Sequence, residues 1–370
     1  MNIVFVSNFL NHHQIPFCEK MIELCDNFNF IATQAGGRQG YQTTTDAPYV
    51  INYNSENKNK VENMIESADA VIFGACPNEL IDLRMRENKL SFLYSERFLK
   101  KGLWRRFIPT TRKKIKDRIV KYENKNMYVL CASAYLSYEL SLFNFPVEKC
   151  FKWGYFPECK NYDIDELISN KTQNSILWCA RLIDWKHPEI PVLVAEKLKS
   201  LNIDFKLNII GTGALEDEIK SMIKEKNLDD CIEMIGSMPP EEVRKNMEKS
   251  QIFLMTSDRQ EGWGAVLNEA MNSACAVIAN KAAGAVPYLI KNGKNGFAYT
   301  KCDIDDICEK IVELFNDKEK MKSVQEQAYY TISNVWNSKV AAERLIKLSN
   351  AILNGEQSPD LFEDGICSKS

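Results

Sequence analysis

Residues 261–299 read EGWGAVLNEAMNSACAVIANKAAGAVPYLIKNGKNGFAY and contain the clearest indication of the fold. This stretch follows an apolar run from Ile252 to Met255, opens with a glycine-rich turn, and then has helical spacing through Met271. A second apolar run, Ala276 to Ala279, comes next. A strand, a turn, a helix and a further strand form the repeating unit of a parallel sheet covered by helices.

The same alternation extends over most of the chain and falls into two sets of predicted strands. The first set is Ile3 to Ser7, Phe28 to Thr33, Ala70 to Phe73, Leu90 to Tyr94 and Met127 to Cys131. The second is Ser175 to Cys179, Phe205 to Ile210, Cys231 to Ile235, Ile252 to Met255, Ala276 to Ala279 and Gly296 to Tyr299. Two successive doubly wound α/β domains are therefore predicted.

The domain boundaries follow from composition and length. A chain of 370 residues is long enough for two domains. The segments expected are a first domain at 1–160, a linker at 161–174, a second domain at 175–335, a closing helix at 336–354 and a tail at 355–370. The linker is placed where the sequence is polar and lacks periodicity, and the tail is expected to be poorly ordered.

Composition and charge exclude several classes of protein. The net charge of −3 argues against a general partnership with nucleic acid. Cysteine and histidine do not occur with metal-ligand spacing, so no metal cofactor is expected. The N-terminus lacks a basic leader, and no run of 18 apolar residues occurs. A cytoplasmic location is expected, with any membrane attachment being peripheral.

Two carboxylates flank the turn that opens the quoted stretch. If its helix begins near Gly264, Glu261 lies in the preceding loop and Glu269 just over one turn inside. Gly262 and Gly264 let the backbone approach a ligand closely, and free amides at a helix start suit anionic or hydroxyl oxygens. The alternative interpretation is that Glu261 only favours the helix dipole and Glu269 lies on a solvated face.

Two further turns follow predicted strands of the second domain. Arg181 and Lys186 come directly after one strand, where they can converge on a diphosphate. Gly211 and Gly213 form a short glycine turn after another strand. Each pattern also occurs in ordinary surface loops and tight turns, so neither is specific without the other.

The second half, from about Asn174 to Leu348, resembles the C-terminal domain of glycosyltransferase family 4, whose members are retaining enzymes of the GT-B fold. The resemblance implies that Glu261 faces the donor sugar, Glu269 holds the ribose, and Arg181 and Lys186 bind the phosphates. The remaining donor contacts that it implies are Gly262, Trp263, Gly264, Ala265, Val266, Gly211, Gly213, Ser237 and Met238. The sequence departs from the family pattern at Ala180 and His187, where glycine is usual.

This resemblance implies two Rossmann-like domains facing a central cleft, with a C-terminal helix crossing back to the first domain. It also implies a metal-independent, retaining enzyme that moves a hexose-type sugar from a UDP- or GDP-sugar to a glycan or lipid-linked glycan, in surface polysaccharide synthesis. Two alternatives remain open. One is a sugar-nucleotide epimerase or hydrolase of the same fold, and the other is a non-catalytic accessory glycosyltransferase subunit.

Acceptor contacts are expected in the first domain. Asn11, His12 and His13 follow the first strand, and Glu96 and Arg97 follow the strand Leu90 to Tyr94. The histidines could bind an acceptor or phosphate, or transfer a proton. The alternative is that Asn11 caps a helix and the histidines are partly exposed.

The segment Arg97 to Lys121 contains eleven basic residues and a single acid, Asp117, interleaved with apolar side chains. Such a pattern suits an anionic membrane surface or a pyrophosphate-linked acceptor. The alternative is a solvated basic helix.

Overall fold

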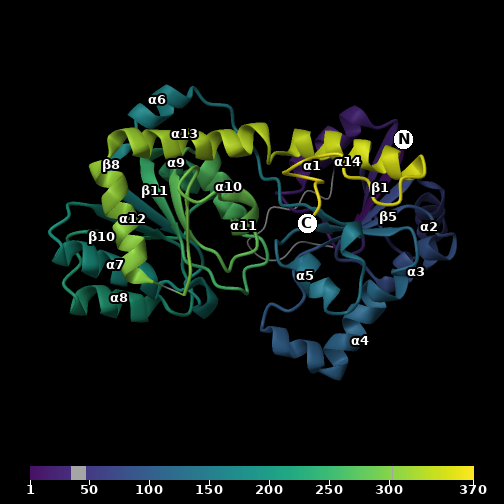
Figure 1. Ribbon diagram of the computed structural model, residues 1–370, viewed down its shortest axis with the longest axis horizontal. Coiled ribbons are helices and arrows are strands. Elements are labelled where there is room, and N and C mark those ends of the chain that lie inside the picture. Colours follow the sequence, from purple (N-terminus) through teal and green to yellow (C-terminus); the bar gives the residue numbers. More distant parts are fainter. Residues whose placement is uncertain (35–46, 302) are drawn as a thin grey trace. The chain divides into compact units, whose positions relative to one another are not determined.

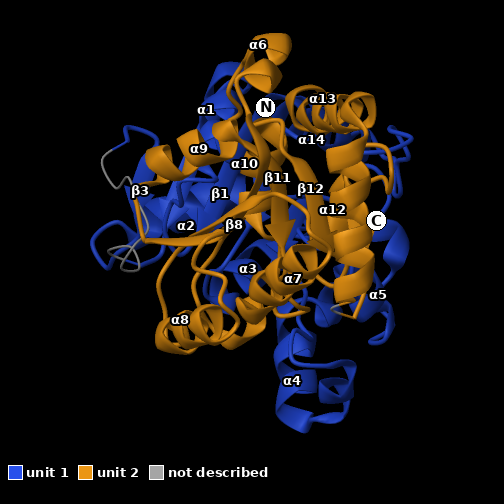
Figure 2. Ribbon diagram, turned by 90° about the vertical axis from the view of Figure 1, so that its left-hand side faces the viewer, with its two compact units in different colours: residues 1–158, 336–370 blue, residues 159–335 orange. Residues whose placement is uncertain are grey.

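The computed structural model describes residues 1–34, 47–301 and 303–370. Within these residues the chain forms two compact units, which Figure 2 distinguishes by colour. Unit 1 contains residues 1–158 and 336–370, and unit 2 contains residues 159–335. The closing helix expected at 336–354 therefore lies in unit 1.

Unit 1 is built on a seven-stranded parallel sheet with the strand order β3-β2-β1-β4-β5-β6-β7. Its strands are β1 Asn2–Ser7, β2 Asn27–Ala32, β3 Val50–Asn52, β4 Ala70–Phe73, β5 Ser91–Ser95, β6 Met127–Cys131 and β7 Cys150–Lys152. In the register, Ile3 lies opposite both Phe28 and Ala70. Strands β4 and β6 are buried along their whole length, as continuous apolar runs covered on both faces should be.

The helices of unit 1 come from both ends of the chain. They are α1 Ile15–Leu24, α2 Lys58–Ser67, α3 Asn78–Arg86, α4 Pro109–Arg118, α5 Leu136–Ser141 and α14 Ser338–Leu353, with short 3₁₀ turns at Leu103–Phe107, Val120–Tyr122 and Val147–Lys149. Helix α14 lies beside α1, as Figure 1 shows. Its buried side chains, among them Leu345 and Leu348, join the two ends of the chain in one unit.

Unit 2 has a six-stranded parallel sheet with the order β10-β9-β8-β11-β12-β13. Its strands are β8 Thr172–Cys179, β9 Lys206–Ile210, β10 Ile232–Gly236, β11 Ser250–Met255, β12 Ala276–Asn280 and β13 Phe297–Tyr299. Its helices are α6 Ile164–Ser169, α7 Glu189–Ser200, α8 Glu216–Glu225, α9 Pro240–Lys249, α10 Ala265–Asn272, α11 Val286–Leu289, α12 Ile304–Asn316 and α13 Lys318–Asn334, with a 3₁₀ turn at Asp184–Lys186. Helix α7 packs on α12, and α10 packs on α13.

The predicted fold class is confirmed, since both sheets are parallel and all eleven predicted strands are present. Strands β3 and β7 were missed. Each is only three residues long, and the sequences VIN and CFK contain no apolar run that would identify a strand. Among the described residues, no helix has both the length and the apolar character of a membrane span.

The interpretation of 161–174 as a linker was wrong, because these residues belong to unit 2 and contain α6 and the start of β8. The Asp163 carboxylate accepts a hydrogen bond from the Glu166 amide and so caps α6. The backbone of this stretch is also held in place, since the Tyr162 amide donates to the Tyr329 hydroxyl at 3.1 Å.

The expectation of a poorly ordered tail was also wrong. Lys369 forms an antiparallel bridge with Phe151 of β7, and the Cys367 amide donates to the Lys152 carbonyl at 2.8 Å. Ile366 and Cys367 are buried. Because β7 is the last strand of its sheet, its outer backbone groups need partners, and the tail supplies them.

Candidate functional site

The carboxyl ends of the unit 2 strands are followed by loops that bond to one another through their backbones. The Ala180 amide donates to the Ile210 carbonyl at 3.1 Å, and the Gly211 amide donates to the Gly236 carbonyl at 2.8 Å. The Asp258 amide, beyond β11, donates to the Trp185 carbonyl at 2.9 Å. The loops after β8, β9, β10 and β11 therefore form one connected edge, where parallel α/β sheets bind ligands.

Helix α10 begins where the sequence predicted. Gly264 is its N-cap, in the left-handed conformation with φ of 97°, and a Cβ atom there would lie 2.4 Å from Met255 Cε. Only glycine avoids both the conformational penalty and this clash. The turn leaves Glu261 in the loop and Glu269 inside the helix. In the described part of the chain, the amides of Ala265 and Val266 find no acceptor, as expected of a first helical turn.

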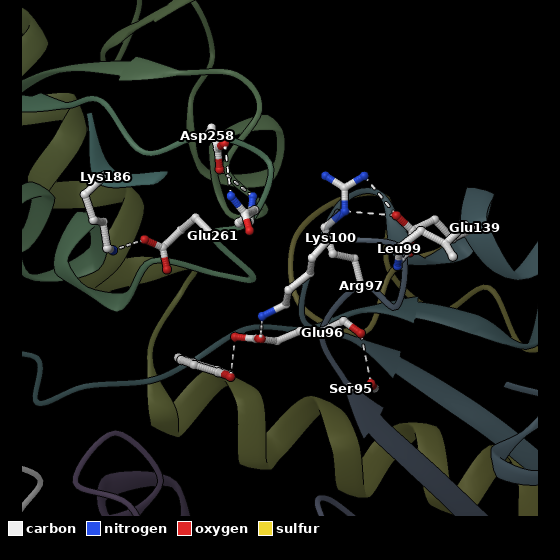
Figure 3. A network of polar contacts seen from close by, with 11 residues as sticks. Ser95, Glu96, Arg97, Leu99, Lys100, Glu139, Lys186, Asp258 and Glu261 are labelled. Carbon is white, nitrogen blue, oxygen red and sulfur yellow. Dashed lines mark hydrogen bonds and ion pairs between the residues drawn. The ribbon is translucent and has the colours of Figure 1, made fainter. Parts of the chain in front are cut away.

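Lys186 and Glu261 form an ion pair across the site, which the close-up in Figure 3 shows. Each side chain is only 12% exposed. Charges that are shielded from water interact more strongly than surface charges, so this pair is an electrostatic centre of the loop edge. The Lys186 ammonium also lies 4.4 Å from the centre of the Trp185 ring.

Arg181 also lies over the Trp185 ring, with its guanidinium carbon 5.8 Å from the ring centre. Its side chain is exposed, and within the described residues it has no ion-pair or hydrogen-bond partner. Two cations thus share one loop, one of them paired and the other free to receive an anion. A guanidinium in this position can take two phosphate oxygens at once.

Glu269 is half-buried, and among the described residues its carboxylate has no hydrogen-bond or ion-pair partner. Burial raises the pKa of Glu269, and the Arg244 guanidinium opposes that shift. Burial also raises the pKa of Cys179, the last residue of β8, to about 12, and there Glu269 adds to the shift while Lys186 reduces it. Both charges therefore lie near the end of β8. Unpartnered, shielded ionisable groups are typical of ligand sites.

The glycine turn after β9 has a structural reason of its own. Gly211 has φ of 136°, and a Cβ atom there would lie 1.9 Å from the Ala180 carbonyl oxygen. At Gly213 a Cβ atom would lie 2.3 Å from the Leu182 carbonyl oxygen. Both glycines are therefore needed so that this turn can pack on the loop carrying Arg181. They support the site by positioning that loop.

Other predicted donor contacts differ in what they can offer. Trp263 is fully buried and its indole N–H donates to Asn268 Oδ1 at 2.9 Å, so only its backbone can face a ligand. Ser237 is exposed after β10. Met238 is half-buried, with its sulfur accepting from Asn246 at 3.4 Å.

His187 occupies a position where the sequence departs from the family pattern. Its φ is 51°, so it adopts the left-handed conformation that glycine favours. Its Nδ1 lies 2.8 Å from Glu189 Oε1 and its Nε2 lies 3.8 Å from Asp258 Oδ2. Contacts with two carboxylates help to hold a conformation that is otherwise unfavourable, so the loop keeps its shape without the glycine.

Unit 1 contains a separate polar cluster that the sequence predicted only in part. The His13 ring stacks on Tyr155, with centroids 4.2 Å apart and planes at 8°. The Tyr155 hydroxyl donates to Glu96 Oε1 at 2.6 Å, and Lys100 pairs with the same carboxylate. Tyr155 carried no sequence signal, because it follows the unpredicted strand β7.

Burial keeps the two predicted histidines neutral. It lowers the pKa of His13 to about 3, with a further contribution from His12, and it lowers the pKa of His12 as well. Neither ring therefore supplies a positive charge for a phosphate at neutral pH. The alternative in which Asn11 caps the helix was wrong, since Gln14 is the N-cap and accepts from the Asn11 amide at 3.0 Å.

Arg97 was predicted to contact the acceptor, but the structure assigns it a structural role. It is buried and pairs with Glu139 at 2.9 Å, while the same carboxylate accepts from the Leu99 amide at 2.8 Å. Its guanidinium also lies 4.4 Å from the Tyr135 ring centre.

Within the described residues, no group of three or more histidine, cysteine, aspartate or glutamate side chains could hold a metal ion.

Comparison with known proteins supports the resemblance noted from sequence. Residues 160–331 match the family model described as "Glycosyl transferases group 1". The amylovoran biosynthesis glycosyltransferase AmsK of Erwinia amylovora is 25% identical, over 74% of this chain and 67% of its own length. The putative colanic acid biosynthesis glycosyltransferase WcaL of Salmonella typhimurium is 26% identical, over 47% of this chain and 44% of its own length. The resemblance to group 1 glycosyltransferases is confirmed.

The fold also has a close structural counterpart. The crystal structure of Anabaena HepE in complex with UDP superposes with a TM-score of 0.70 at 14% identity, covering 95% of this chain and all of that one. This likeness shows a GT-B fold. The sequence match to WcaL is shorter than this superposition, and it spans less than half the length of WcaL.

Proposed function

We propose that the chain is a glycosyltransferase that moves a sugar from a nucleoside diphosphate donor to a glycan or lipid-linked glycan. One observation carries the proposal. Arg181, Lys186, Glu261 and Glu269 gather at the loop edge of a unit that matches the family model. Two cations suit the diphosphate of a sugar nucleotide, and two carboxylates suit the hydroxyls of its ribose and sugar.

In the proposed complex, Arg181 and Lys186 bind the diphosphate, Glu269 accepts from the ribose hydroxyls, and Glu261 accepts from the sugar. The amides of Ala265 and Val266 add donors at the start of α10. Gly262, Gly264, Gly211 and Gly213 shape the surrounding backbone, and Ser237 and Met238 border the base. A UDP- or GDP-linked hexose is the proposed donor, and the UDP bound in HepE supports the first of these.

Catalysis in this scheme is electrostatic. As the bond between the sugar and the diphosphate breaks, negative charge grows on the leaving phosphate, and Arg181 and Lys186 stabilise it. We propose that these two cations act without a metal ion. We also propose retention of configuration through attack on the same face, with the leaving phosphate accepting the proton of the acceptor hydroxyl.

The proposed role is surface polysaccharide synthesis in the cytoplasm. The printed names of AmsK and WcaL, which concern amylovoran and colanic acid, support this role. The acceptor is proposed to lie near Glu96, His12 and His13 of unit 1, beside the cluster that includes Tyr155.

The two alternatives predict different products. An epimerase or hydrolase would consume the donor without an acceptor, whereas an accessory subunit would bind no sugar nucleotide. The unpaired carboxylate of Glu269 argues against an accessory subunit, because a scaffold gains nothing from a half-buried charge without a partner.

The test is a thermal-shift and calorimetric panel of nucleoside diphosphates and their hexose conjugates, with and without EDTA. We expect the nucleotides of one nucleobase to raise the melting temperature of the wild type. Glu269→Ala should abolish that stabilisation. Glu225→Ala, at the exposed end of α8, is the matched control and should bind like the wild type. Absence of binding by any nucleotide to folded protein would overturn the proposal.

A positive result leads to the reaction itself. The identified donor is incubated with candidate glycan acceptors, and NMR of the product reports its anomeric configuration. Inversion would contradict the proposed mechanism, and loss of activity in EDTA would contradict metal independence. Rapid donor consumption without an acceptor would favour the epimerase or hydrolase.

A further inference from the structure

The connection between β5 and β6 forms a projection of unit 1. It contains the 3₁₀ turn Leu103–Phe107 and helix α4, and Figure 2 shows α4 extending away from the rest of this unit. The base of the projection is firmly held, because Leu99, Ile115 and Ile119 are buried in the core of unit 1. Arg118 adds a hydrogen bond to the Cys76 carbonyl at 2.7 Å.

Two large aromatic side chains stand out from this projection. Trp104 is 60% exposed and Phe107 is 68% exposed, and no other large hydrophobic side chain in the described residues is as exposed. Each carries an arginine beside its ring, with Arg105 5.7 Å from the Trp104 ring centre and Arg106 4.7 Å from that of Phe107. A firmly anchored segment that exposes such residues to water indicates an interaction surface.

The surrounding charges are strongly one-sided. Three of the eleven basic residues of the segment are neutralised by carboxylates, since Arg97, Lys100 and Lys121 pair with Glu139, Glu96 and Asp82. Arg118 bonds to backbone carbonyls. The other seven have no carboxylate partner within the described residues. They are Lys101, Arg105, Arg106, Arg112, Lys113, Lys114 and Lys116.

The charge of this segment is opposite in sign to that of the whole chain. With eleven basic residues and one acid it carries a formal charge of +10, whereas the whole chain carries −3, so the remaining residues together carry −13. A partner that binds here must be anionic and must approach this projection in particular, because the rest of the chain repels it.

We infer that the projection binds the surface of an anionic phospholipid bilayer. Trp104 and Phe107 enter the headgroup region, and the seven basic side chains without a carboxylate partner contact lipid phosphates. Aromatic rings flanked by cations favour the boundary between lipid and water. Single-stranded nucleic acid also binds aromatic and basic residues, but it follows a groove in which successive bases stack. This segment is a projection, and a projection suits a flat surface. The inference does not rest on the proposed function.

The experiment is co-sedimentation of the full chain with vesicles of phosphatidylglycerol and phosphatidylcholine, and with vesicles of phosphatidylcholine alone. We expect binding only to the anionic vesicles, with strong weakening at 500 mM NaCl. The variant R112Q/K113Q/K114Q/K116Q should lower the partition constant by roughly fivefold for each charge removed. W104S/F107S should lower it by more than about tenfold, because the interfacial contacts are lost.

Matched controls come from unit 2. K220Q/K224Q/K245Q/K249Q removes the same charge from exposed lysines, and L201S/Y330S removes two other exposed hydrophobic side chains. Both controls should bind like the wild type. Far-ultraviolet circular dichroism and thermal melting establish that each variant is folded.

Fluorescence gives an independent measure of insertion. Of the six tryptophans, Trp153, Trp178, Trp263 and Trp336 are buried, Trp185 is half-buried and Trp104 is the exposed one. Brominated phosphatidylglycerol should therefore quench Trp104 emission in the wild type and leave W104S unaffected. Equal binding to neutral vesicles, unchanged binding of the W104S/F107S variant, or binding of single-stranded RNA in place of vesicles would overturn the inference.

Discussion

The Lys186 ammonium is paired with the Glu261 carboxylate, although 75 residues separate them in the sequence. The pair joins the loop after β8 to the loop before α10. In the proposed function these two side chains face different parts of the donor, Lys186 the phosphate and Glu261 the sugar. A diphosphate that binds to Lys186 must therefore compete with Glu261, and the released carboxylate becomes available to the sugar hydroxyls.

Glu261→Gln separates binding from catalysis. We expect nucleoside diphosphate to bind at least as tightly as to the wild type, because Lys186 no longer has an anionic partner. The transfer rate should fall by about 10²- to 10³-fold, the usual effect of removing a group that stabilises the transition state. Calorimetry and initial rates measure the two quantities. Lys186→Met is the opposing control and should weaken nucleotide binding. Weaker binding by Glu261→Gln would contradict the proposed competition.

Glu269→Gln should increase stability while it removes nucleotide binding. The folded protein raises the pKa of this carboxyl above the ordinary value of 4.5, so ionisation is harder in the folded state than in the unfolded state. The folded state then binds more protons between the two pKa values, and stability falls as pH rises through that window. Replacement should therefore raise stability at pH 7.5 and leave it unchanged at pH 4. Thermal melting at both pH values checks this, and a loss of stability at pH 7.5 would oppose it.

Gly211→Ala and Gly236→Ala form a matched pair. Both glycines have positive φ, 136° and 83°, but a Cβ atom at Gly211 would meet the Ala180 carbonyl, whereas one at Gly236 would meet nothing within 4 Å. Gly236→Ala should therefore cost only the strain of the left-handed backbone, about 1 kcal/mol. Gly211→Ala should cost about 3 kcal/mol, and it should displace the loop of Arg181 and weaken nucleotide binding. Urea unfolding measures the first effect and calorimetry the second. Equal costs at the two positions would contradict the packing argument.

His13 should make the fold sensitive to acid. The pKa of His13 is about 3 in the folded state, against an ordinary value of 6.5. Between these two pH values the ring is protonated in the unfolded chain and neutral in the folded protein. Stability should therefore be complete above pH 6.5 and should fall as pH drops toward 3. His13→Phe keeps an aromatic ring beside Tyr155 and should flatten this dependence. With three histidines in the chain, NMR can follow each ring directly. A His13 signal that titrates near pH 6.5 would contradict the assignment.

Much of the fold could be predicted because it is local. The apolar runs that form β4, β6, β11 and β12 are continuous and bounded by turns, so their periodicity identifies them. The start of α10 could be predicted for the same reason, since Gly264 precedes the helical spacing directly. Strands of three residues, such as β3 and β7, lack enough positions to show a period.

The contacts between side chains were harder to predict from the sequence than the positions of the candidate site residues. Arg181, Lys186, Glu261 and Glu269 could be identified by their place after strands, since parallel strands end at one edge. The structural role of Arg97 could not be predicted, because it depends on Glu139, which is 42 residues away in the sequence. Tyr155 could not be found, because its importance comes from the His13 ring and the Glu96 carboxylate that it contacts.

The order of residues was enough to predict two parallel α/β units, the turns that follow their strands, and the charged residues that those turns carry. These properties depend on the order of neighbouring residues, which periodicity and glycine placement record. The three-dimensional arrangement was needed to see which charges meet, as Lys186 meets Glu261, and that Lys369 pairs with Phe151 at the edge strand β7. Such pairings depend on distances between segments far apart in the chain, and those distances exist only once the sheets have formed.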